Sequence, residues 1–599
     1  MCGIIAYIGP RPLAPILLDG LAKLEYRGYD SAGLAVLDGA NLKTIKQIGR
    51  IKELSQHPDI KDIGCGLGIA HTRWATHGEP SEINAHPHLD CSGEIAIVHN
   101  GIIENYTALK EILVQEGHII KSATDSEILA HLIEKFYQGD LSMAIRQALK
   151  LVEGAFGLAV IKKNENKIIV ARRGSPLVIG LGQNEMFVAS DIPAILNHTR
   201  QVIYLQDNEM AVVTSDNYEI TNLDGEILSR QVEDIKWSVT ELEKKGFKHF
   251  MLKEIVEQAE ALTNVLRGRV KNGQIKLSVN FEPDKIKRII ITACGTSWHS
   301  ALVGKYYLEA LTQIPVEVDY ASEFRYRNPI LGAQDLVIAI SQSGETADTL
   351  AAIKEAKNKQ ANTLGIVNVV GSTITREVGS GIYLHIGPEI GVASTKAFTA
   401  QVLTLLLLAL YLRQQLGWPL PAQILEEIEI LPGFIKQTLD SDKLTQRLAG
   451  IFKDANNFLY LGRGLNFPVA LEGALKLKEI SYIHAEGYPA AEIKHGPIAL
   501  IDKNMPVVFI ATKNTLTQKI LSNMQEVKAR GGTIIAVVNA DQEDIYKVAD
   551  YTIIVPTVSE MLSPIVNTIP LQLLAYYIAD GRGLDVDKPR NLAKSVTVE

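Results

Sequence analysis

The 599-residue sequence predicts an α+β domain at the amino end, followed by two α/β domains built on parallel sheets. First, short apolar strands and separate helical patterns fill the segment up to residue 237. Second, strands and helices alternate beyond about residue 250, which is typical of βαβ units. Third, this alternation occurs twice at an offset of roughly 170 residues, which indicates two similar domains rather than a solenoid.

In the first part, apolar runs that end in polar or glycine-bearing turns predict strands. These runs lie at 2–9, 32–37, 66–74, 94–101, 156–161, 167–173 and 185–190. Apolar residues at helical spacing predict helices at 105–118 and 125–138. In the second part, one copy of the repeat begins at Arg288 and the other at Asn457.

Changes in composition predict the domain boundaries. The first domain is expected at 1–237, and the charged, weakly periodic segment 238–250 is expected to be a linker. The two α/β domains are expected at 251–430 and 431–580, and a tail at 581–599.

Composition argues against several classes of protein. The net charge of −8 gives no basic nucleic-acid footprint, so we expect no nucleic-acid partner. The four cysteines have no CxxC spacing, which argues against zinc ribbons and disulfide scaffolds and fits a reducing compartment. They are Cys2, Cys65, Cys91 and Cys294.

The longest apolar run, from Val402 to Leu412, is shorter than the roughly 20 residues that span a membrane. We therefore expect it to form a buried helix and expect no membrane partner. The amino end, MCGIIAYIG, lacks the basic start and long apolar core of a signal peptide. A cytoplasmic location is the expectation.

Cys2 is a candidate nucleophile because it directly follows Met1. Removal of Met1 would give Cys2 a free α-amine, with an ordinary pKa of about 7.7–8.0, that could act as base for its own thiol. The thiolate is the strong nucleophile. A cysteine at this position can also have no catalytic role.

The motifs YRGYDSAG, HTRWATHG, HNGIIENY and TDSE follow Cys2 in order, and the segment to about Trp237 resembles class II glutamine amidotransferases of the N-terminal nucleophile fold. The resemblance implies that Cys2 attacks the side-chain amide of glutamine and that the HNG motif supplies the oxyanion hole. It assigns the glutamine pocket to the motifs HTRWATHG and TDSE. The implied residues are Asn100 and Gly101 for the oxyanion hole, Arg73 for the α-carboxylate, Asp125 for the α-ammonium, and Thr76 and His77 for the pocket lining.

Other roles are open for two of these residues. Arg73 could form a surface ion pair, and Asp125 could cap the helix that follows it. Four nearby histidines also raise the question of a metal, but the HExxH pattern is absent and His86-Pro-His88 makes an awkward chelate. We therefore expect no metal at His71, His77, His86 and His88.

The turn SQSGET joins a predicted strand to a predicted helix, where backbone N–H groups and the helix dipole favour an anion. The turn CGTS occupies the same place after the preceding strand, and adjacent ends of parallel strands form one crevice. Simple helix capping is the alternative. The candidate phosphate ligands are Thr296, Ser297, Ser341, Gln342, Ser343 and Thr346.

The segment from about Leu252 to Glu599 resembles tandem sugar isomerase (SIS) domains. With the first part, the chain resembles the isomerising glutamine–fructose-6-phosphate aminotransferase family, so glutamine and fructose 6-phosphate are the expected substrates. The motifs are CGTSWHSA, SQSGETADT, GVASTKAFT, ALKLKEISYIHAEGYPAAEIKHGPIALID and KPRNLAKSVTVE. The departures are Gly487 and Pro489, where alanines are expected, and the stretch NVVGSTITREVGSGI.

The resemblance implies that Lys594 forms a Schiff base with the ketose, and that Glu479 moves a proton between C1 and C2. His495 would assist ring opening from a neighbouring subunit, which implies a homodimer. Glu472 and Val392 would complete the sugar pocket. Lys476 lies three residues before Glu479 on one helix face, where an ordinary surface ion pair is the alternative.

The resemblance also makes Trp74 the gate of an internal ammonia passage, although Trp74 could simply pack in the core. No cofactor is expected, because neither GxGxxG nor GxxxxGK[ST] is complete. Two alternatives remain: a sugar-phosphate sensor, which would need a DNA-binding module, and a deglycase, which would lack the glutaminase motifs.

Overall fold

The computed structural model describes residues 2–39, 41–235 and 243–597. It divides into two compact units, residues 1–242 with 595–599, and residues 243–594. The predicted linker at 238–250 lies partly outside the described residues. The fold class is confirmed, since the first unit holds antiparallel sheets with helices and the second holds two parallel α/β sheets.

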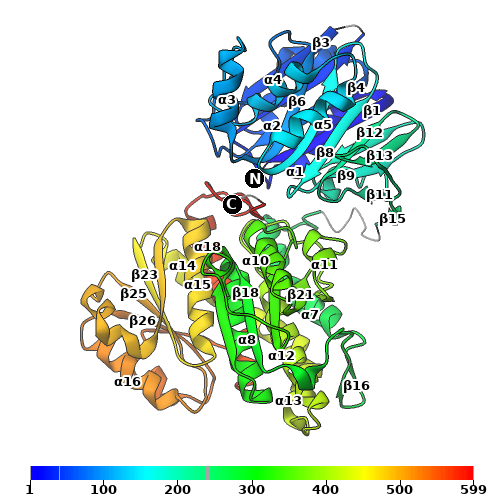
Figure 1. Ribbon diagram of the computed structural model, residues 1–599. Helices are drawn as coiled ribbons and strands as arrows, with labels where there is room; N and C mark the ends of the chain where they lie inside the picture. Colours follow the sequence, from blue (N-terminus) through cyan, green and yellow to red (C-terminus); the bar gives the residue numbers. More distant parts are fainter. Residues whose placement is uncertain (1, 40, 236–242, 598–599) are drawn as a thin grey trace. The chain divides into compact units, whose positions relative to one another are not determined.

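Two antiparallel sheets form the centre of the first unit (Figure 1). The eight-stranded sheet contains, in spatial order, β15 (Glu233–Asp234), β11 (Gln201–Tyr204), β9 (Val178–Leu181), β10 (Met186–Ala189), β1 (Gly3–Pro12), β4 (Cys65–Arg73), β2 (Ser31–Asp38) and β3 (Asn41–Ile48). The seven-stranded sheet contains β14 (Ile227–Leu228), β13 (Tyr218–Asn222), β12 (Glu209–Val213), β8 (Ile168–Arg173), β7 (Gly154–Lys162), β6 (Ile95–Ile103) and β5 (His88–Leu89).

Successive side chains of a strand point to opposite faces of its sheet, and in these two sheets both faces pack against apolar residues. Along β1, Ile4 packs in a core cluster shared with Val98 of the other sheet. The next residue, Ile5, points to the opposite cluster with Leu17 of a helix. The unit therefore has four layers, with a helix layer outside each sheet. The helices are α1 (Leu13–Leu24) and α2 (Ile51–Ser55) on one side, and α3 (Tyr106–Gln115), α4 (Glu127–Phe136) and α5 (Leu141–Leu151) on the other.

Each sheet of the second unit has five parallel strands, the number and direction that alternating βα units produce. The first contains β19 (Val316–Tyr320), β18 (Arg288–Ala293), β20 (Asp335–Ser341), β21 (Asn362–Val367) and β22 (Ser380–Tyr383). The second contains β24 (His484–Pro489), β23 (Asn457–Gly462), β25 (Pro506–Ile510), β26 (Thr533–Val538) and β27 (Tyr551–Ile554). The strand order is equivalent in the two sheets, as the internal repeat predicts.

One large apolar cluster joins both sheets through long helices, which are labelled in Figure 1. These are α8 (Gly295–Thr312), α12 (Lys396–Gln415), α15 (Asn466–Ser481) and α18 (Ser563–Gly581). The apolar run at Val402–Leu412 lies inside α12, which is long and apolar enough to cross a membrane but is 83% buried in this core. The prediction of a buried helix is confirmed.

The remaining elements surround this core. They are α6 (Phe250–Val256), α7 (Gln258–Leu266), the hairpin of β16 (Val270–Lys271) and β17 (Gln274–Ile275), α9 (Ala321–Phe324), α10 (Ala347–Asn358), α11 (Thr373–Glu377), α13 (Ala422–Leu439), α14 (Asp442–Phe452), α16 (Thr517–Lys528) and α17 (Glu543–Tyr546). The departure at Gly487 has a packing reason in this chain. A Cβ there would lie 2.7 Å from the Cα of Leu471, so β24 lies against α15 at glycine distance.

Gly462, at the end of β23, allows the chain to turn directly into α15, because a Cβ at this residue would lie 2.0 Å from the carbonyl oxygen of Asn466. We expect Gly462→Ala to lower the thermal unfolding midpoint by roughly 2–10 °C, since the clash is with backbone. Gly450→Ala in α14, where a Cβ meets open space, should leave the midpoint unchanged or raise it. Equal midpoints for the two variants in scanning calorimetry would contradict this account.

Candidate active site

Cys2 lies immediately before β1, and pairing of β1 with β4 brings it beside the end of β4. The Cys2 sulfur accepts the N–H of Trp74 at 3.4 Å and lies 3.7 Å from the Trp74 carbonyl oxygen. Desolvation raises the pKa of the Cys2 thiol, whereas the Trp74 N–H and the Arg73 charge lower it. Since the net pKa is raised, the thiol needs a base to become a nucleophile at neutral pH.

Asn100 and Gly101 lie on β6, and the amide of Asn100 has a fixed orientation. Its Nδ2 donates to the carbonyl oxygen of Cys2 at 3.1 Å, while its Oδ1 lies 3.1 Å from Nε2 of His71. At Gly101, φ is +138° and a Cβ would lie 2.0 Å from the carbonyl oxygen of Ala155. Only glycine fits there, so the HNG motif presents both an oriented amide and bare backbone near Cys2.

Arg73 and Asp125 are both buried, which excludes a surface ion pair for Arg73. The Arg73 guanidinium donates to the carbonyl oxygens of His77 and Gly78, and burial lowers its pKa. Asp125 accepts the backbone N–H of Ile103 at 2.9 Å, and the N-cap of α4 is Ser126, so Asp125 is not the helix cap. Charges on both side chains act on the Cys2 thiol.

The other two residues predicted for the glutamine pocket lie in the loop after β4. Thr76 is exposed and His77 is half-buried. The His77 ring packs edge-on against Tyr106, with 5.4 Å between the ring centres. This places His77 between the loop and the beginning of α3.

The buried histidines near Cys2 form a stack. The rings of His71 and His86 are 4.0 Å apart, and His86 meets His88 edge-on at 4.5 Å. Nδ1 of His86 accepts the N–H of His99 at 3.3 Å. Burial lowers the pKa of His71 to about 3 and lowers that of His86 as well, so both rings are neutral at physiological pH. Neutral His71 can donate to Asn100 and thereby keeps Nδ2 of that amide directed at Cys2.

In the second unit, the turns after β18 and β20 lie at the carboxyl ends of two neighbouring parallel strands. Gly344 adopts φ +68°, and a Cβ there would lie 2.0 Å from the Ser372 hydroxyl, so the SQSGET turn requires glycine. The Ser341 hydroxyl accepts the N–H of Gly344 and lies 3.0 Å from the hydroxyl of Thr346. Thr346 is the N-cap residue of α10 but makes no side-chain capping bond, so helix capping does not account for this hydroxyl.

The first turn of α8 meets a buried ion cluster on α15. Nζ of Lys476 lies 2.7 Å from Glu479 and 3.3 Å from Glu472, and donates to the Thr296 hydroxyl at 2.9 Å. Nδ1 of His299 lies 2.7 Å from Glu472. Burial opposes the Lys476 charge, but the two carboxylates outweigh it and raise the Lys476 pKa. The surface ion pair considered for Lys476 is therefore excluded, since Lys476 is fully buried.

Ser297, Gln342 and Ser343 take different positions around these turns. The Ser297 hydroxyl is buried and accepts from the side chain of Gln401 on α12 at 3.0 Å. The Ser343 hydroxyl accepts the backbone N–H of Glu345, and the backbone carbonyl oxygen of Gln342 accepts the backbone N–H of Asn368. These bonds hold the SQSGET turn in one conformation.

A second buried ion pair holds Lys594. Its ammonium donates to Glu389 at 2.5 Å and to the carbonyl oxygen of Gly391 at 2.8 Å, next to Val392. Burial of Glu389 is outweighed by Lys594, which lowers the Glu389 pKa to about 2. Glu254, which accepts the N–H groups of Ile390 and Gly391, has its pKa raised to about 8 by burial and by Glu389.

His495 is exposed at the end of a short 3-10 helix, Ala490–His495. The structure thus places it on the surface of the chain.

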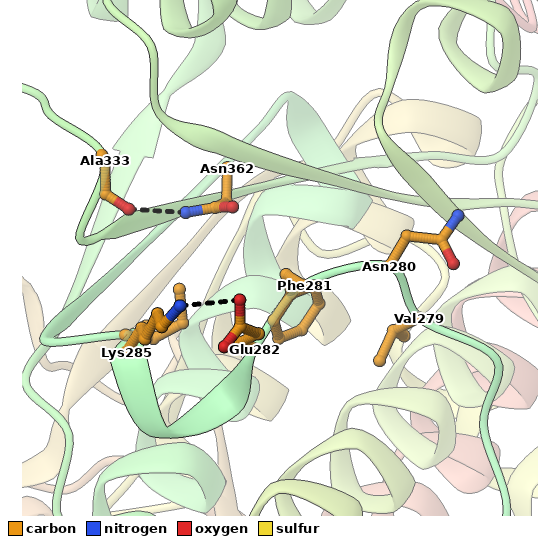
Figure 2. A pocket seen from close by; sticks show the side chains of 8 residues that line it. Val279, Asn280, Phe281, Glu282, Lys285, Ala333 and Asn362 are labelled. Carbon is orange, nitrogen blue, oxygen red and sulfur yellow. Dashed lines mark hydrogen bonds and ion pairs between the residues drawn. The ribbon is translucent and has the colours of Figure 1, made fainter.

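A pocket of about 360 Å³ lies elsewhere in the second unit (Figure 2). Asn362 and Ala333, which line it, lie at the amino ends of β21 and β20, the edge opposite the two polar turns. Lys285 and Glu282 pair with each other at 2.8 Å on its wall, and none of the predicted site residues lines it. Because ligands bind at the carboxyl ends of parallel strands, this pocket is not our candidate site.

Family models match both units. A glutamine amidotransferase domain matches residues 71–197, and a SIS domain matches residues 284–411 and 451–579. The glutamine–fructose-6-phosphate aminotransferase (isomerising) of Chlorobaculum tepidum is 54% identical, and that of Thermus thermophilus is 50% identical; each alignment covers all of both chains. The chain belongs to the isomerising glutamine–fructose-6-phosphate aminotransferase family.

A solved structure supports the fold of the second unit. The C-terminal domain of the glucosamine–fructose-6-phosphate aminotransferase of Francisella tularensis is 41% identical, with a TM-score of 0.56. It covers 58% of this chain, and 99% of its own length is matched.

Several residues that contact the candidate site residues were not predicted from the sequence. His71 orients Asn100, His299 contacts Glu472, and Glu389 holds Lys594. His71 had a signal, its place within HTRWATHG, but we considered it only as a metal ligand. His299 also had a signal, its place within CGTSWHSA, but we assigned it no role. Glu389 gave no local signal, because its partner Lys594 lies far away in the sequence.

Acidification should destabilise the first unit, because its buried histidines gain protons only on unfolding. The His71 pKa is about 3 when folded and about 6.5 when unfolded, so the unfolded chain binds more protons between these values. The unfolding free energy should therefore fall as pH falls from 6.5 toward 3, by up to about 1.4 kcal/mol per pH unit for each such histidine. Hydrogen exchange of β4 and β6, converted to opening free energies at pH 7.5 and 5.0, measures this. His86→Gln should flatten the dependence, and equal values at both pH values would contradict it.

Proposed function

We propose that this chain transfers the amide nitrogen of glutamine to fructose 6-phosphate, with isomerisation, and releases glucosamine 6-phosphate and glutamate. The observation that carries the proposal is the 54% identity to the Chlorobaculum tepidum enzyme over the whole of both chains. The reaction is a first step toward amino-sugar precursors, and it needs no cofactor.

In the glutaminase half, Cys2 attacks the glutamine amide. The α-amine freed by loss of Met1 takes the thiol proton, and ammonia leaves as the thioester forms. Asn100 and Gly101 stabilise the oxyanion, an arrangement supported by the direction of the Asn100 amide toward Cys2. Water then hydrolyses the thioester and releases glutamate.

Arg73 and Asp125 bind the α-carboxylate and α-ammonium of glutamine, and Thr76 and His77 line the pocket. The opposite charges of Arg73 and Asp125, both buried and both acting on the Cys2 thiol, support this pairing with a zwitterion. Trp74 gates the passage of ammonia, since its backbone contacts the nucleophile and it follows Arg73 directly.

In the sugar half, the turns after β18 and β20 bind the phosphate through Thr296, Ser297, Ser341, Gln342, Ser343 and Thr346. Lys594 loses a proton to solvent, leaves Glu389 and adds as a free amine to the ketose carbonyl; the carbonyl oxygen departs as water and a Schiff base forms. Glu479 moves the proton between C1 and C2. Glu472, Lys476 and Val392 shape the sugar pocket.

His495 assists ring opening in the site of a neighbouring subunit, and the chain works as a homodimer. The exposed position of His495 supports a role outside its own chain. A cytoplasmic location completes the proposal.

The first test compares the unmodified chain with Cys2→Ala for glucosamine 6-phosphate production. With glutamine as donor, Cys2→Ala should lose at least about 10³-fold in rate, because the covalent step is gone. High ammonium salt should restore product in the variant, because the sugar half does not need Cys2. Cys65→Ala, at an exposed thiol on β4, is the matched control and should stay active. The proposal fails if the unmodified chain, with Met1 removed, neither hydrolyses glutamine nor makes product.

The second test separates the two halves through Lys594→Arg. Arginine keeps the positive charge beside Glu389 but forms no Schiff base, so product should fall at least about 100-fold with glutamine or ammonium as donor. Glutamine hydrolysis, measured as glutamate release, should persist. Lys503→Arg, at an exposed lysine of the same unit, is the control. Full synthesis by Lys594→Arg would remove the Schiff-base role.

A further inference from the structure

Four potential metal ligands from separate segments of the first unit converge at one point. Cys91 lies in the turn between β5 and β6, His118 lies in the loop after α3, and His131 and Glu134 lie on α4. Their four ligand atoms, Sγ of Cys91, Nδ1 of each histidine and Oε2 of Glu134, all lie within 4.8 Å of one another. The two histidines of this cluster are distinct from the group His71, His77, His86 and His88.

Four of the six separations among these atoms are close to the edge lengths of a small coordination tetrahedron. Sγ of Cys91 lies 3.3 Å from Nδ1 of His131 and 3.6 Å from Nδ1 of His118. Oε2 of Glu134 lies 3.1 Å from His118 and 3.6 Å from His131. Tetrahedral zinc with bonds of about 2.3 Å to sulfur and 2.0–2.2 Å to nitrogen and oxygen separates its ligands by roughly 3.3–3.6 Å.

A carboxylate beside His131 fixes the orientation of this histidine. Nε2 of His131 lies 3.5 Å from Oε1 of Glu127, one turn earlier on α4. When Nε2–H donates to this carboxylate, the lone pair of His131 lies on Nδ1 and faces Cys91 and Glu134. A histidine ligand that donates its other nitrogen to a carboxylate is the usual arrangement around protein-bound metals.

We propose that Cys91, His118, His131 and Glu134 bind one structural Zn²⁺. Thiolate and imidazole ligands favour Zn²⁺ over Mg²⁺ and Ca²⁺, which take oxygen ligands. Four protein ligands close the coordination sphere, so the ion has no open position for catalysis. Binding releases the thiol proton of Cys91, and the thiolate and carboxylate together balance the two charges of the ion.

The site would fasten the loop that precedes α4. Glu127 also accepts the N–H groups of Lys121 and Ser122, so His131 is linked to the loop that leads to Asp125. With His118 at the other end of this loop, zinc would hold both ends against α4. The ion therefore stabilises the wall of the glutamine pocket without touching the substrate.

The test measures metal in the full chain, purified without an affinity tag or chelator. Elemental analysis should find about one zinc per chain, and Cys91→Ser and His131→Asn should each lose at least about 10-fold of it. Cys65→Ser, at the other exposed thiol of the unit, should keep the full amount. Cobalt-substituted protein should show a sulfur-to-metal charge-transfer band that disappears in Cys91→Ser, and chelation should lower the unfolding midpoint of the first unit.

The proposal is overturned if zinc stays below roughly 0.1 per chain after dialysis against micromolar Zn²⁺. It is also overturned if Cys91→Ser retains as much zinc as the unmodified chain. A different first-row metal in stoichiometric amount would overturn the assignment to zinc. Because metal content is read without substrates, the result is independent of the proposed aminotransferase activity.

Discussion

The antiparallel pairing of β1 with β4 is the constraint on which the glutaminase half depends. It sets Gly3 opposite Thr72, so Cys2 cannot move without disturbing a strand that is buried on both faces. The same register places Arg73 and Trp74 beside the thiol. A one-residue slip would exchange the two faces of β1, so Ile4 would face the helix layer and Ile5 would face the other sheet. The apolar pattern of β1 therefore fixes the position of Cys2.

Buried charge is the corresponding constraint in the sugar half. Lys476 and Lys594 are each held by carboxylates in the interior, where an unpaired ammonium would be strongly unfavourable. Pairing keeps each lysine in one place, and the attraction between the charges offsets part of the free energy lost when the ammonium leaves water. In the proposed Schiff-base role Lys594 has to leave Glu389, so substrate binding must supply the interactions that free its amine. Glu254 accepts the N–H of Gly391, the residue whose carbonyl oxygen binds Lys594. Because its pKa is raised to about 8, Glu254 is mostly uncharged at neutral pH and adds no second negative charge beside the Lys594–Glu389 pair.

The sequence predicted elements where apolar patterning is strong. The runs at β1, β4, β6 and β7 are continuous because both faces of each strand are covered, and the repeat marked both parallel sheets. Short strands at the edges, such as β14 and β15, were not predicted, since two residues carry no period. Helix α1 was also missed, although its apolar spacing is helical.

The site was predictable where a motif is local. The SQSGET turn became a candidate because one strand end carries several functional groups, whereas Asn100 and Gly101 became candidates through the resemblance of the HNG motif. The pairs Lys594–Glu389 and His299–Glu472 could not, because only the tertiary fold joins them. The cluster around Cys91 escaped for the same reason, since its four ligands come from three segments and follow no recognised spacing.

The stack of neutral histidines narrows the choice of a base for Cys2. Among the described residues, the polar partners of the Cys2 sulfur are the backbone groups of Trp74. His71 is linked to Cys2 through Asn100, but its Nε2 lies close to Asn100 and the carbonyl oxygen of His99, and burial lowers its pKa to about 3. An imidazole with so low a pKa is a poor proton acceptor at neutral pH. His71 therefore orients Asn100. The low pKa of His71 favours our proposal that the α-amine of Cys2, once Met1 is removed, deprotonates the thiol.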